Sequence, residues 1–284
     1  MTEIVNAHLI EFRKHLATIK SLSTDRTDKN GITPNADRSI NSYNKHAARL
    51  GGQGNSSVLH NRESLRALVV STNDDSLEFV CAAILAWGGM SATSFDALFD
   101  APEKQRWLGI ARRIKSEGLQ RGQAFKEFSD LRAEKIKGSR KSMLPGMGPA
   151  YFTKLIHFLM PRDQTHPAAH ILDQWAGWSI NTLWNSHIVL MDETFSWKRA
   201  KANPLPPPSL IPSLRVSDVN TCAEYECFCA KVDDLISLLG DEAKSGPLCP
   251  GDLVDRTFMF EKRRKQGTWR NYVVANHKHP RFSK

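Results

Sequence analysis

The sequence has no apolar run long enough for a helix to cross a bilayer, so a helical membrane protein is not expected. Its first residues, MTEIVNAHLIEFRK, carry an early glutamate where a secretory signal would have an uninterrupted apolar segment. We therefore expect a cytoplasmic protein that makes no contact with a membrane. Runs in which apolar and polar residues alternate are also missing, which argues against a protein built from sheets.

Cysteine is scarce, and its five positions do not form a recognisable metal-binding pattern. Cys222, Cys227 and Cys229 have the spacing C-x4-C-x-C, which matches neither a ferredoxin cluster nor a zinc knuckle, even with Cys249 added. The odd number of cysteines and the missing signal segment argue against a disulfide framework. We expect buried structural thiols in a helix, and neither a metal nor an organic cofactor.

Acidic residues are absent from residues 262–284, which nevertheless hold eight lysines and arginines. Lys and Arg outnumber Asp and Glu by 39 to 30 in the whole chain, so this tail accounts for nearly all of the excess. Aromatic residues lie between the basic ones, a composition that suits a polyanion such as a nucleic acid. A solvated basic tail is equally compatible with it. The candidate phosphate contacts here are Arg263, Arg264 and Arg270.

The apolar residues that are present recur at three- and four-residue spacing from Ser64 onward, which predicts helices. Residues 21–62 are polar instead and predict a long loop or arm. A proline-rich stretch, Pro204–Pro212, predicts a stiff connector. The expected helices cover two runs between 64 and 87, and then roughly 102–115, 120–136, 149–160, 171–184, 219–239 and 252–262. We therefore expect an all-α protein with about nine helices.

A glycine hairpin, LPGMG at 144–148, precedes the helix expected from Pro149. Its glycines allow a tight reversal with positive φ, and proline suits the first helical position. The free amides of the turn and the helix dipole then form an anion site that can grip a DNA phosphate without reading sequence. A plain helical turn that happens to use glycine remains an alternative. The candidate DNA contacts are Gly146, Gly148 and Ala150, with Lys137, Arg140 and Lys141 on a short basic helix expected at 136–142.

This hairpin, the helix after it and the segment Ile171-Leu172-Asp173 together resemble the helix–hairpin–helix DNA glycosylase superfamily, in its 8-oxoguanine glycosylase-like branch. The segments PAYFTK (149–154) and ILDQW (171–175) resemble those of bacterial glycosylases that attack modified phage DNA. The resemblance implies a two-layer helical fold with a DNA cleft between the layers. Residues 1–63 would pack with the C-terminal part 173–284, and residues 64–172 would form the bundle that carries the hairpin.

The resemblance makes Asp173 the catalytic carboxylate, which stabilises positive charge on the sugar or orients a water while the N-glycosidic bond breaks. Asp173 also suits the N-cap of the following helix. The Schiff-base lysine of the bifunctional relatives corresponds to Ala150, whereas Lys154 lies one turn later on the same face. Lys154 can be a shifted nucleophile, a phosphate contact or a solvated surface residue, and we expect the hydrolytic, monofunctional reaction. An insertion at 161–170 lengthens the interval before Asp173.

A base inside a duplex must be flipped out before such chemistry, and a protein wedge commonly fills the space that it leaves. The loop that follows the helix ending at Trp87 lies where the relatives carry wedge residues, so Met90 or Trp87 is the candidate, with core packing as the alternative for Trp87. Candidate side chains for a base pocket are Tyr151, Phe152, His166, His170, Trp175 and Trp178.

We therefore expect a DNA glycosylase that excises a modified base and leaves an abasic site. Glucosylated hydroxymethylcytosine of phage DNA is the first candidate, which would make the protein an antiviral enzyme. The alternatives are an 8-oxoguanine repair glycosylase and a nonenzymatic DNA-binding module. The resemblance further implies double-stranded DNA as the partner, a monomer, and hairpin carbonyls able to hold a monovalent cation.

Overall fold

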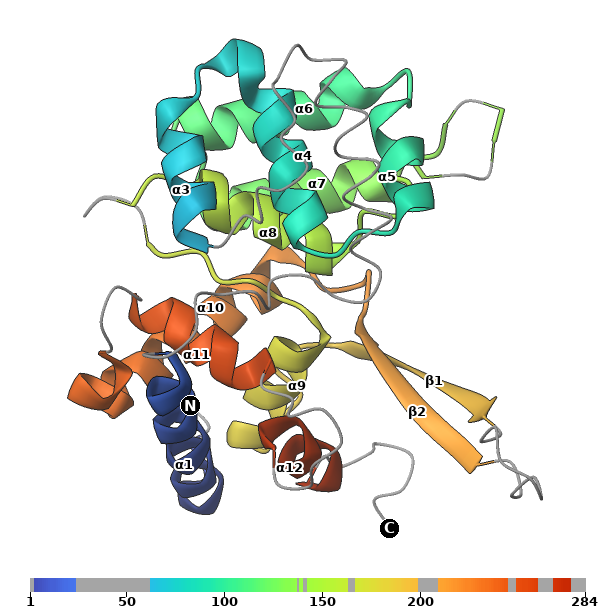
Figure 1. Cartoon of the computed structure of the whole chain (residues 1–284). Helices are drawn as coiled ribbons and strands as arrows, with labels where there is room; N and C mark the ends of the chain where they lie inside the picture. Colours follow the sequence, from blue (N-terminus) through green and yellow to red (C-terminus); the bar gives the residue numbers. More distant parts are fainter. Residues whose placement is uncertain are drawn as a thin grey trace.

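The computed structural model of the chain describes residues 3–23, 62–136, 138–139, 142–162, 167–198, 209–244, 249–259 and 268–276 (Figure 1). Most of the polar arm expected at 21–62 lies outside these residues. The same holds for six residues predicted to contact DNA or a flipped base: Lys137, Arg140, Lys141, His166, Arg263 and Arg264.

The described chain is helical apart from one two-stranded hairpin, which confirms the all-α prediction for the fold. Short 3₁₀ turns occupy Asp74–Ser76 and Gly240–Ala243. The helices are α1 (Asn6–Ser23), α3 (Arg62–Ser71), α4 (Leu77–Trp87), α5 (Ala92–Phe99), α6 (Lys104–Ser116), α7 (Arg121–Ala133), α8 (Pro149–Leu159), α9 (Gln174–Leu183), α10 (Cys222–Leu239), α11 (Pro250–Met259) and α12 (Trp269–Asn276).

These helices form two layers (Figure 1). The first layer holds α3 to α8 and is built around α4, whose residues from Val80 to Ala86 are all buried because both faces of this helix are apolar. Helix α4 packs on α3, α6 and α8. The second layer holds α1 and α9 to α12, and α10 also packs on α7 of the first layer.

The first helix joins the second layer, although the whole first layer follows it in the sequence. Phe12 of α1 is fully buried between Phe258 of α11 and Trp269, with ring centroids 5.5 and 5.0 Å away. His8 Nδ1 lies 2.7 Å from the hydroxyl of Tyr272 in α12. Aromatic packing therefore ties the beginning of the described chain to its last helices.

The hairpin was not expected from the sequence. Strands β1 (Met191–Lys198) and β2 (Ser209–Val216) pair antiparallel, with Met191 opposite Val216 and Lys198 opposite Ser209, and they extend away from the two layers (Figure 1). The connector predicted for 204–212 is thus wrong from Ser209 onward. Pro212 lies within β2, and a proline in the sequence argues against a strand because it has no N–H to donate to a sheet. In a two-stranded hairpin both strands are edge strands, so the missing donor is tolerated.

The short basic helix predicted for 136–142 is also wrong. Helix α7 ends at Ala133, Lys135 bridges Ser142 in antiparallel fashion, and Gly138 has φ +77°. The amide of Met143 donates to the carbonyl of Glu134 at 3.0 Å, so the chain reverses in a narrow loop. Glycine and serine favour this loop over a helix of so few residues.

The cysteines are partly as predicted. Cys81 and Cys229 are fully buried, and burial raises the pKa of the Cys229 thiol to about 12. Cys227, on the outer face of α10, is exposed, so the prediction of buried thiols is wrong there. The described residues contain no group of three or more His, Cys, Asp or Glu side chains arranged to hold a metal ion. None of their helices is both long and apolar enough to span a membrane.

The glycine hairpin has the predicted positive φ at Gly146, +72°, but not at Gly148, which is the extended N-cap with φ −89°. Pro149 begins α8, as predicted. Gly146 also lies against α5, because a Cβ built on it would be 2.3 Å from the Cβ of Ser94. The turn therefore needs glycine for two reasons, namely its positive φ and the space that Ser94 occupies.

These two reasons can be separated by a pair of substitutions. Gly146→Ala should lower the free energy of unfolding by about 3 kcal/mol, because it adds overpacking against Ser94 to the strain of positive φ. Gly138→Ala, at φ +77° with open space around it, should cost only about 1 kcal/mol. Chemical denaturation of both variants measures the difference, and equal losses would contradict the packing argument.

Candidate active site

Asp173 is the N-cap of α9, as predicted, and its side chain is only 8% exposed. Its Oδ1 atom accepts hydrogen bonds from the backbone N–H groups of Trp175 and Ala176, at 2.9 and 3.0 Å. Both bonds end on the same oxygen, and no described residue donates to Oδ2. The carboxylate is therefore fixed in orientation while one of its oxygens stays available to a substrate.

Asp173 is held against the hairpin helix by one buried threonine. The hydroxyl of Thr153 donates to the carbonyl of Pro149 at 2.7 Å and accepts the amide of Leu172 at 3.1 Å. Leu172 immediately precedes Asp173, so this bond sets the distance between the start of α8 and the catalytic candidate. The insertion at 161–170 leaves that contact intact.

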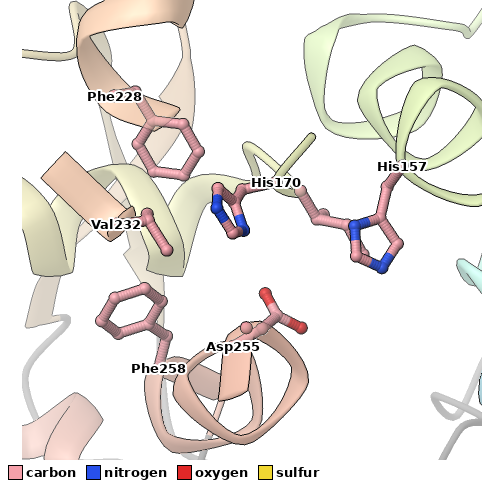
Figure 2. A pocket seen from close by; sticks show the side chains of 8 residues that line it. His157, His170, Phe228, Val232, Asp255 and Phe258 are labelled. Atoms are coloured by element: carbon pink, nitrogen blue, oxygen red, sulfur yellow. The ribbon is translucent and has the colours of Figure 1, made fainter. Parts of the chain in front are cut away.

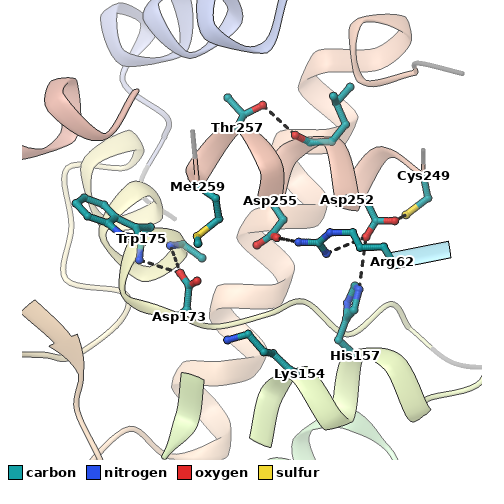
Figure 3. A network of polar contacts seen from close by, with 12 residues as sticks. Arg62, Lys154, His157, Asp173, Trp175, Cys249, Asp252, Asp255, Thr257 and Met259 are labelled. Carbon is teal, nitrogen blue, oxygen red and sulfur yellow. Dashed lines mark hydrogen bonds and ion pairs between the residues drawn. The ribbon is translucent and has the colours of Figure 1, made fainter. Parts of the chain in front are cut away.

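Lys154 is not a surface residue, which rules out one of the three roles considered for it. Its side chain is 8% exposed and its stem lies so close to Gly88 that a Cβ there would be 2.6 Å from Cδ. The amine donates to the carbonyl of Ala150 at 2.6 Å and lies 5.2 Å from the centre of the Tyr151 ring. In Figure 3 the amine points toward Asp173 and Asp255.

Burial lowers the pKa of Lys154, because an ammonium loses its hydration inside the protein. The negative charges of Asp173 and Asp255 act in the opposite direction, and the positive charge of Arg62 adds to the effect of burial. The lysine of α8 is therefore influenced by three charged groups, which come from α3, α11 and the N-cap of α9.

A buried group of polar side chains that no sequence motif indicated lies beside Lys154, and we call it the Asp252 cluster (Figure 3). Each member is hydrogen-bonded or ion-paired to at least one other; the members are Arg62, Arg66, His157, Cys249, Asp252 and Asp255. Both oxygens of Asp252 are engaged: Oδ1 by Arg62 at 3.2 Å and Oδ2 by Arg66 at 2.6 Å. Arg62 also pairs with Asp255.

The Asp252 cluster joins the two layers, because its arginines come from α3, His157 from α8, and both carboxylates from α11. Asp252 is fully buried; although burial alone would raise its pKa, the Arg62 charge and the hydrogen bond from Arg66 hold that pKa well below its usual range. Charged residues spaced three or four apart, Arg62 with Arg66 and Asp252 with Asp255, were the signal available in the sequence.

The surroundings of His157 determine which of its ring nitrogens carries a proton. Its Nδ1 faces the carbonyl of Ala169 at 2.6 Å and must therefore carry a proton, while Nε2 accepts from Arg66 at 3.3 Å and from Arg162 at 3.2 Å. Burial lowers the pKa of His157 to about 4, so the ring is neutral at neutral pH.

A small pocket lies behind this site, between α8, α10 and α11 (Figure 2). His157, His170 and Asp255 form its polar side, and Phe228, Val232 and Phe258 form its apolar side. His170 is buried and its Nε2 lies 2.7 Å from Asp233, so it supports α10 and does not face a flipped base. The prediction of His170 as a base contact is corrected accordingly.

Two aromatic residues predicted for a base pocket lie in the core instead. Phe152 is fully buried, with its ring 5.0 Å from Phe125 and 5.4 Å from Phe128. Trp178 is 4% exposed and stacks on Trp175 at 5.5 Å. Both point inward because they occupy the apolar faces of α8 and α9.

The other two aromatic candidates lie next to the catalytic residues. Tyr151 is half-buried beside Lys154, and its hydroxyl donates to the carbonyl of Gly89 at 3.2 Å. Trp175 follows Asp173 by two residues, is half-buried, and carries the guanidinium of Arg270 at 4.5 Å from its ring centre. Arg270, predicted to bind phosphate, thus packs on an aromatic face of the site.

The wedge prediction fails for Met90. Its side chain is fully buried in the first layer, so it cannot enter a duplex without leaving the core. Trp87 is half-buried between the guanidinium of Arg62, 4.8 Å from its ring centre, and the ring of Phe158 at 5.1 Å. Packing of Trp87, the alternative considered above, is what the structure shows.

Around the hairpin, the carbonyl of Leu144 accepts a hydrogen bond from Arg132 at 3.2 Å. Arg132 also forms an ion pair with Asp218, at 2.7 Å. A Cβ built on Gly148 would be in ordinary van der Waals contact, 3.6 Å from Arg132 and Asp218. The two glycines thus differ, because a Cβ fits at Gly148 but not at Gly146, where Ser94 occupies the space.

The model of the family described as "Putative 8-oxoguanine DNA glycosylase OGG-like protein" matches residues 33–229, more than half of the chain. The match includes the hairpin, Lys154 and Asp173, and it ends before the α11 residues of the Asp252 cluster. Searches of curated proteins and of solved structures gave no match.

The neutral, buried His157 predicts a pH dependence of stability. Because its pKa is near 4 in the folded protein and near 6.5 when unfolded, the unfolded chain binds the extra proton first as the pH falls. The free energy of unfolding should therefore be highest above pH ~6.5 and fall by up to about 3 kcal/mol toward pH ~4. Denaturation of wild type and His157→Asn, which keeps a donor for Ala169, isolates this contribution as their difference. A difference independent of pH would contradict the prediction.

Proposed function

Because the chain belongs to the OGG-like family of 8-oxoguanine DNA glycosylases, we propose that it removes a modified base from double-stranded DNA by cleaving the N-glycosidic bond. One observation carries this proposal. The buried amine of Lys154 points toward Asp173, whose Oδ2 accepts no hydrogen bond from the described residues, at the junction of the two layers (Figure 3).

The reaction that we propose is hydrolysis by a monofunctional enzyme. As the bond to the base breaks, positive charge develops on the sugar, and a fixed carboxylate stabilises it and orients the attacking water. Asp173 suits this role, because two N–H bonds hold Oδ1 and leave Oδ2 for the substrate. The position of the family's Schiff-base lysine holds Ala150, whose carbonyl binds the Lys154 amine.

The substrate that we propose is glucosylated hydroxymethylcytosine of phage DNA, flipped out of the duplex, and the biological role is antiviral defence. Its support is the resemblance of PAYFTK and ILDQW to segments of bacterial glycosylases that attack such DNA. Tyr151 and Trp175, half-buried beside Lys154 and Asp173, are the aromatic surfaces for the flipped base. We further propose that the protein acts as a cytoplasmic monomer.

Base release tests the proposal directly. Duplexes with glucosylated hydroxymethylcytosine, plain hydroxymethylcytosine, 8-oxoguanine or ordinary bases are incubated with the protein, and free bases are identified by mass spectrometry. We expect release of the glucosylated base, reduced at least about 100-fold in Asp173→Asn. Asparagine still caps α9, so the variant should fold and keep its DNA affinity.

Asp130→Asn, on the exposed surface of α7, is the matched control and should behave as wild type. If only 8-oxoguanine is released, the antiviral role is wrong and the protein is a repair glycosylase. If the protein binds DNA but releases no base from any duplex, it is a DNA-binding module and not an enzyme.

Borohydride trapping distinguishes hydrolysis from a lyase reaction. A lysine that attacks the sugar forms an imine, which borohydride reduces to a stable protein–DNA adduct. The hydrolytic mechanism predicts no adduct with wild type under conditions in which the base is released. An adduct that disappears in Lys154→Ala would show that Lys154 is the nucleophile.

A further inference from the structure

Asp255 is a second carboxylate at Lys154, beside Asp173. It lies on α11, across the junction between the layers from α8, and its side chain is 13% exposed. Its carboxylate pairs with Arg62, and Figure 3 shows it, like Asp173, at the end of the Lys154 side chain that carries the amine. Neither the sequence motifs nor the matched residues 33–229 include Asp255.

The chemistry of base removal creates a use for such a residue. When the glycosidic bond breaks, its electron pair stays with the base, which leaves more readily if it receives a proton. The Lys154 ammonium is the donor next to Asp173. A buried lysine tends to lose its proton, however, and only nearby negative charge keeps it charged.

We propose that Asp255 is a positioning residue that keeps Lys154 in the ammonium form, so that Lys154 donates a proton to the departing base. This inference rests on the proposed glycosylase function. The proton balance closes within the site: the base takes a proton from Lys154, the water oxygen bonds to C1′, and a water proton passes to Oδ2 of Asp173. That proton then replaces the one that Lys154 gave.

Arg62 opposes Asp255 in this arrangement. It pairs with both Asp255 and Asp252 and stacks on Trp87, so its guanidinium is fixed near the amine. The negative charges of Asp173 and Asp255 favour the ammonium of Lys154, and the positive charge of Arg62 disfavours it. Burial raises the pKa of Asp255 itself, and its ion pair with Arg62 opposes that rise and favours the carboxylate. The neighbouring Tyr151 ring belongs to the same helix as the lysine.

Substitutions of the two partners should therefore shift the titration of Lys154 in opposite directions. Asp255→Asn removes a negative charge and should lower the titration midpoint by about one pH unit, whereas Arg62→Gln removes a positive charge and should raise it by a similar amount. A residue that merely holds α11 in place would not produce opposite shifts. The midpoint is read from the Cε resonance of Lys154 in the full chain, assigned with Lys154→Arg.

Asp130→Asn is the charge control. Asp130 lies on the exposed surface of α7, where it pairs with Lys126, and it is not among the charges that act on Lys154. Its loss should leave the Lys154 midpoint within a few tenths of a pH unit of wild type. The Asp255→Glu variant, which keeps the charge, should restore a midpoint close to that of wild type.

The rate of base release gives a second readout. A general acid works only while protonated, so single-turnover release should decline as the pH rises through the Lys154 midpoint. That decline should begin about one pH unit lower in Asp255→Asn and at the wild-type pH in Asp130→Asn.

An unchanged Lys154 midpoint in Asp255→Asn, or shifts of equal sign in Asp255→Asn and Arg62→Gln, would overturn the inference. If Asp255→Asn does not fold, Arg62→Gln alone tests the inference. A Lys154 midpoint that does not rise in Arg62→Gln would then overturn the inference. Opposite shifts without base release by any protein would support the charge coupling and reject the glycosylase function. The two proposals can therefore fail separately.

Discussion

The ion pairing of one fully buried carboxylate, Asp252, is the contact on which the geometry of the candidate site depends. Burying this charge is unfavourable unless each oxygen finds a partner, and Arg62 and Arg66 supply those partners from the other layer. The second layer can therefore dock in only one position relative to α3 and α8. Since α8 carries Lys154 and α11 carries Asp255, the same requirement fixes where the two side chains meet.

Local signals in the sequence were sufficient for much of the helical fold. Proline and glycine marked the start of α8, and Asp173 marked the start of α9, because caps and first-turn residues act through their own backbone neighbours. Where the signals were mixed, the predictions failed. Pro212 masked a strand, and the basic segment 136–142 reversed in a loop because Gly138 adopts positive φ.

The candidate site was predictable only in part, for a physical reason. Asp173 could be found because its motif is local, whereas Arg62 and Asp252 are 190 residues apart and no periodicity connects them. The sequence also could not show which residues of an apolar helix lie in the core and which line a pocket. Phe152 is buried because Phe125 of α7 packs on it, whereas its neighbour Tyr151 is only half-buried. The limits of the predicted domains, and the site residues outside the described chain, remain predictions.

The double engagement of Asp173 has an evolutionary consequence. One oxygen holds the start of a helix, and in the proposed mechanism the other takes part in the chemistry, so selection for folding and selection for catalysis would act on a single codon. Asparagine, serine or threonine at this position would still cap the helix but would lack the negative charge. Glutamate would keep the charge but would not cap the helix. A lineage that lost the chemistry through asparagine would retain a well-folded protein, and such a descendant would be free to drift toward a purely DNA-binding role.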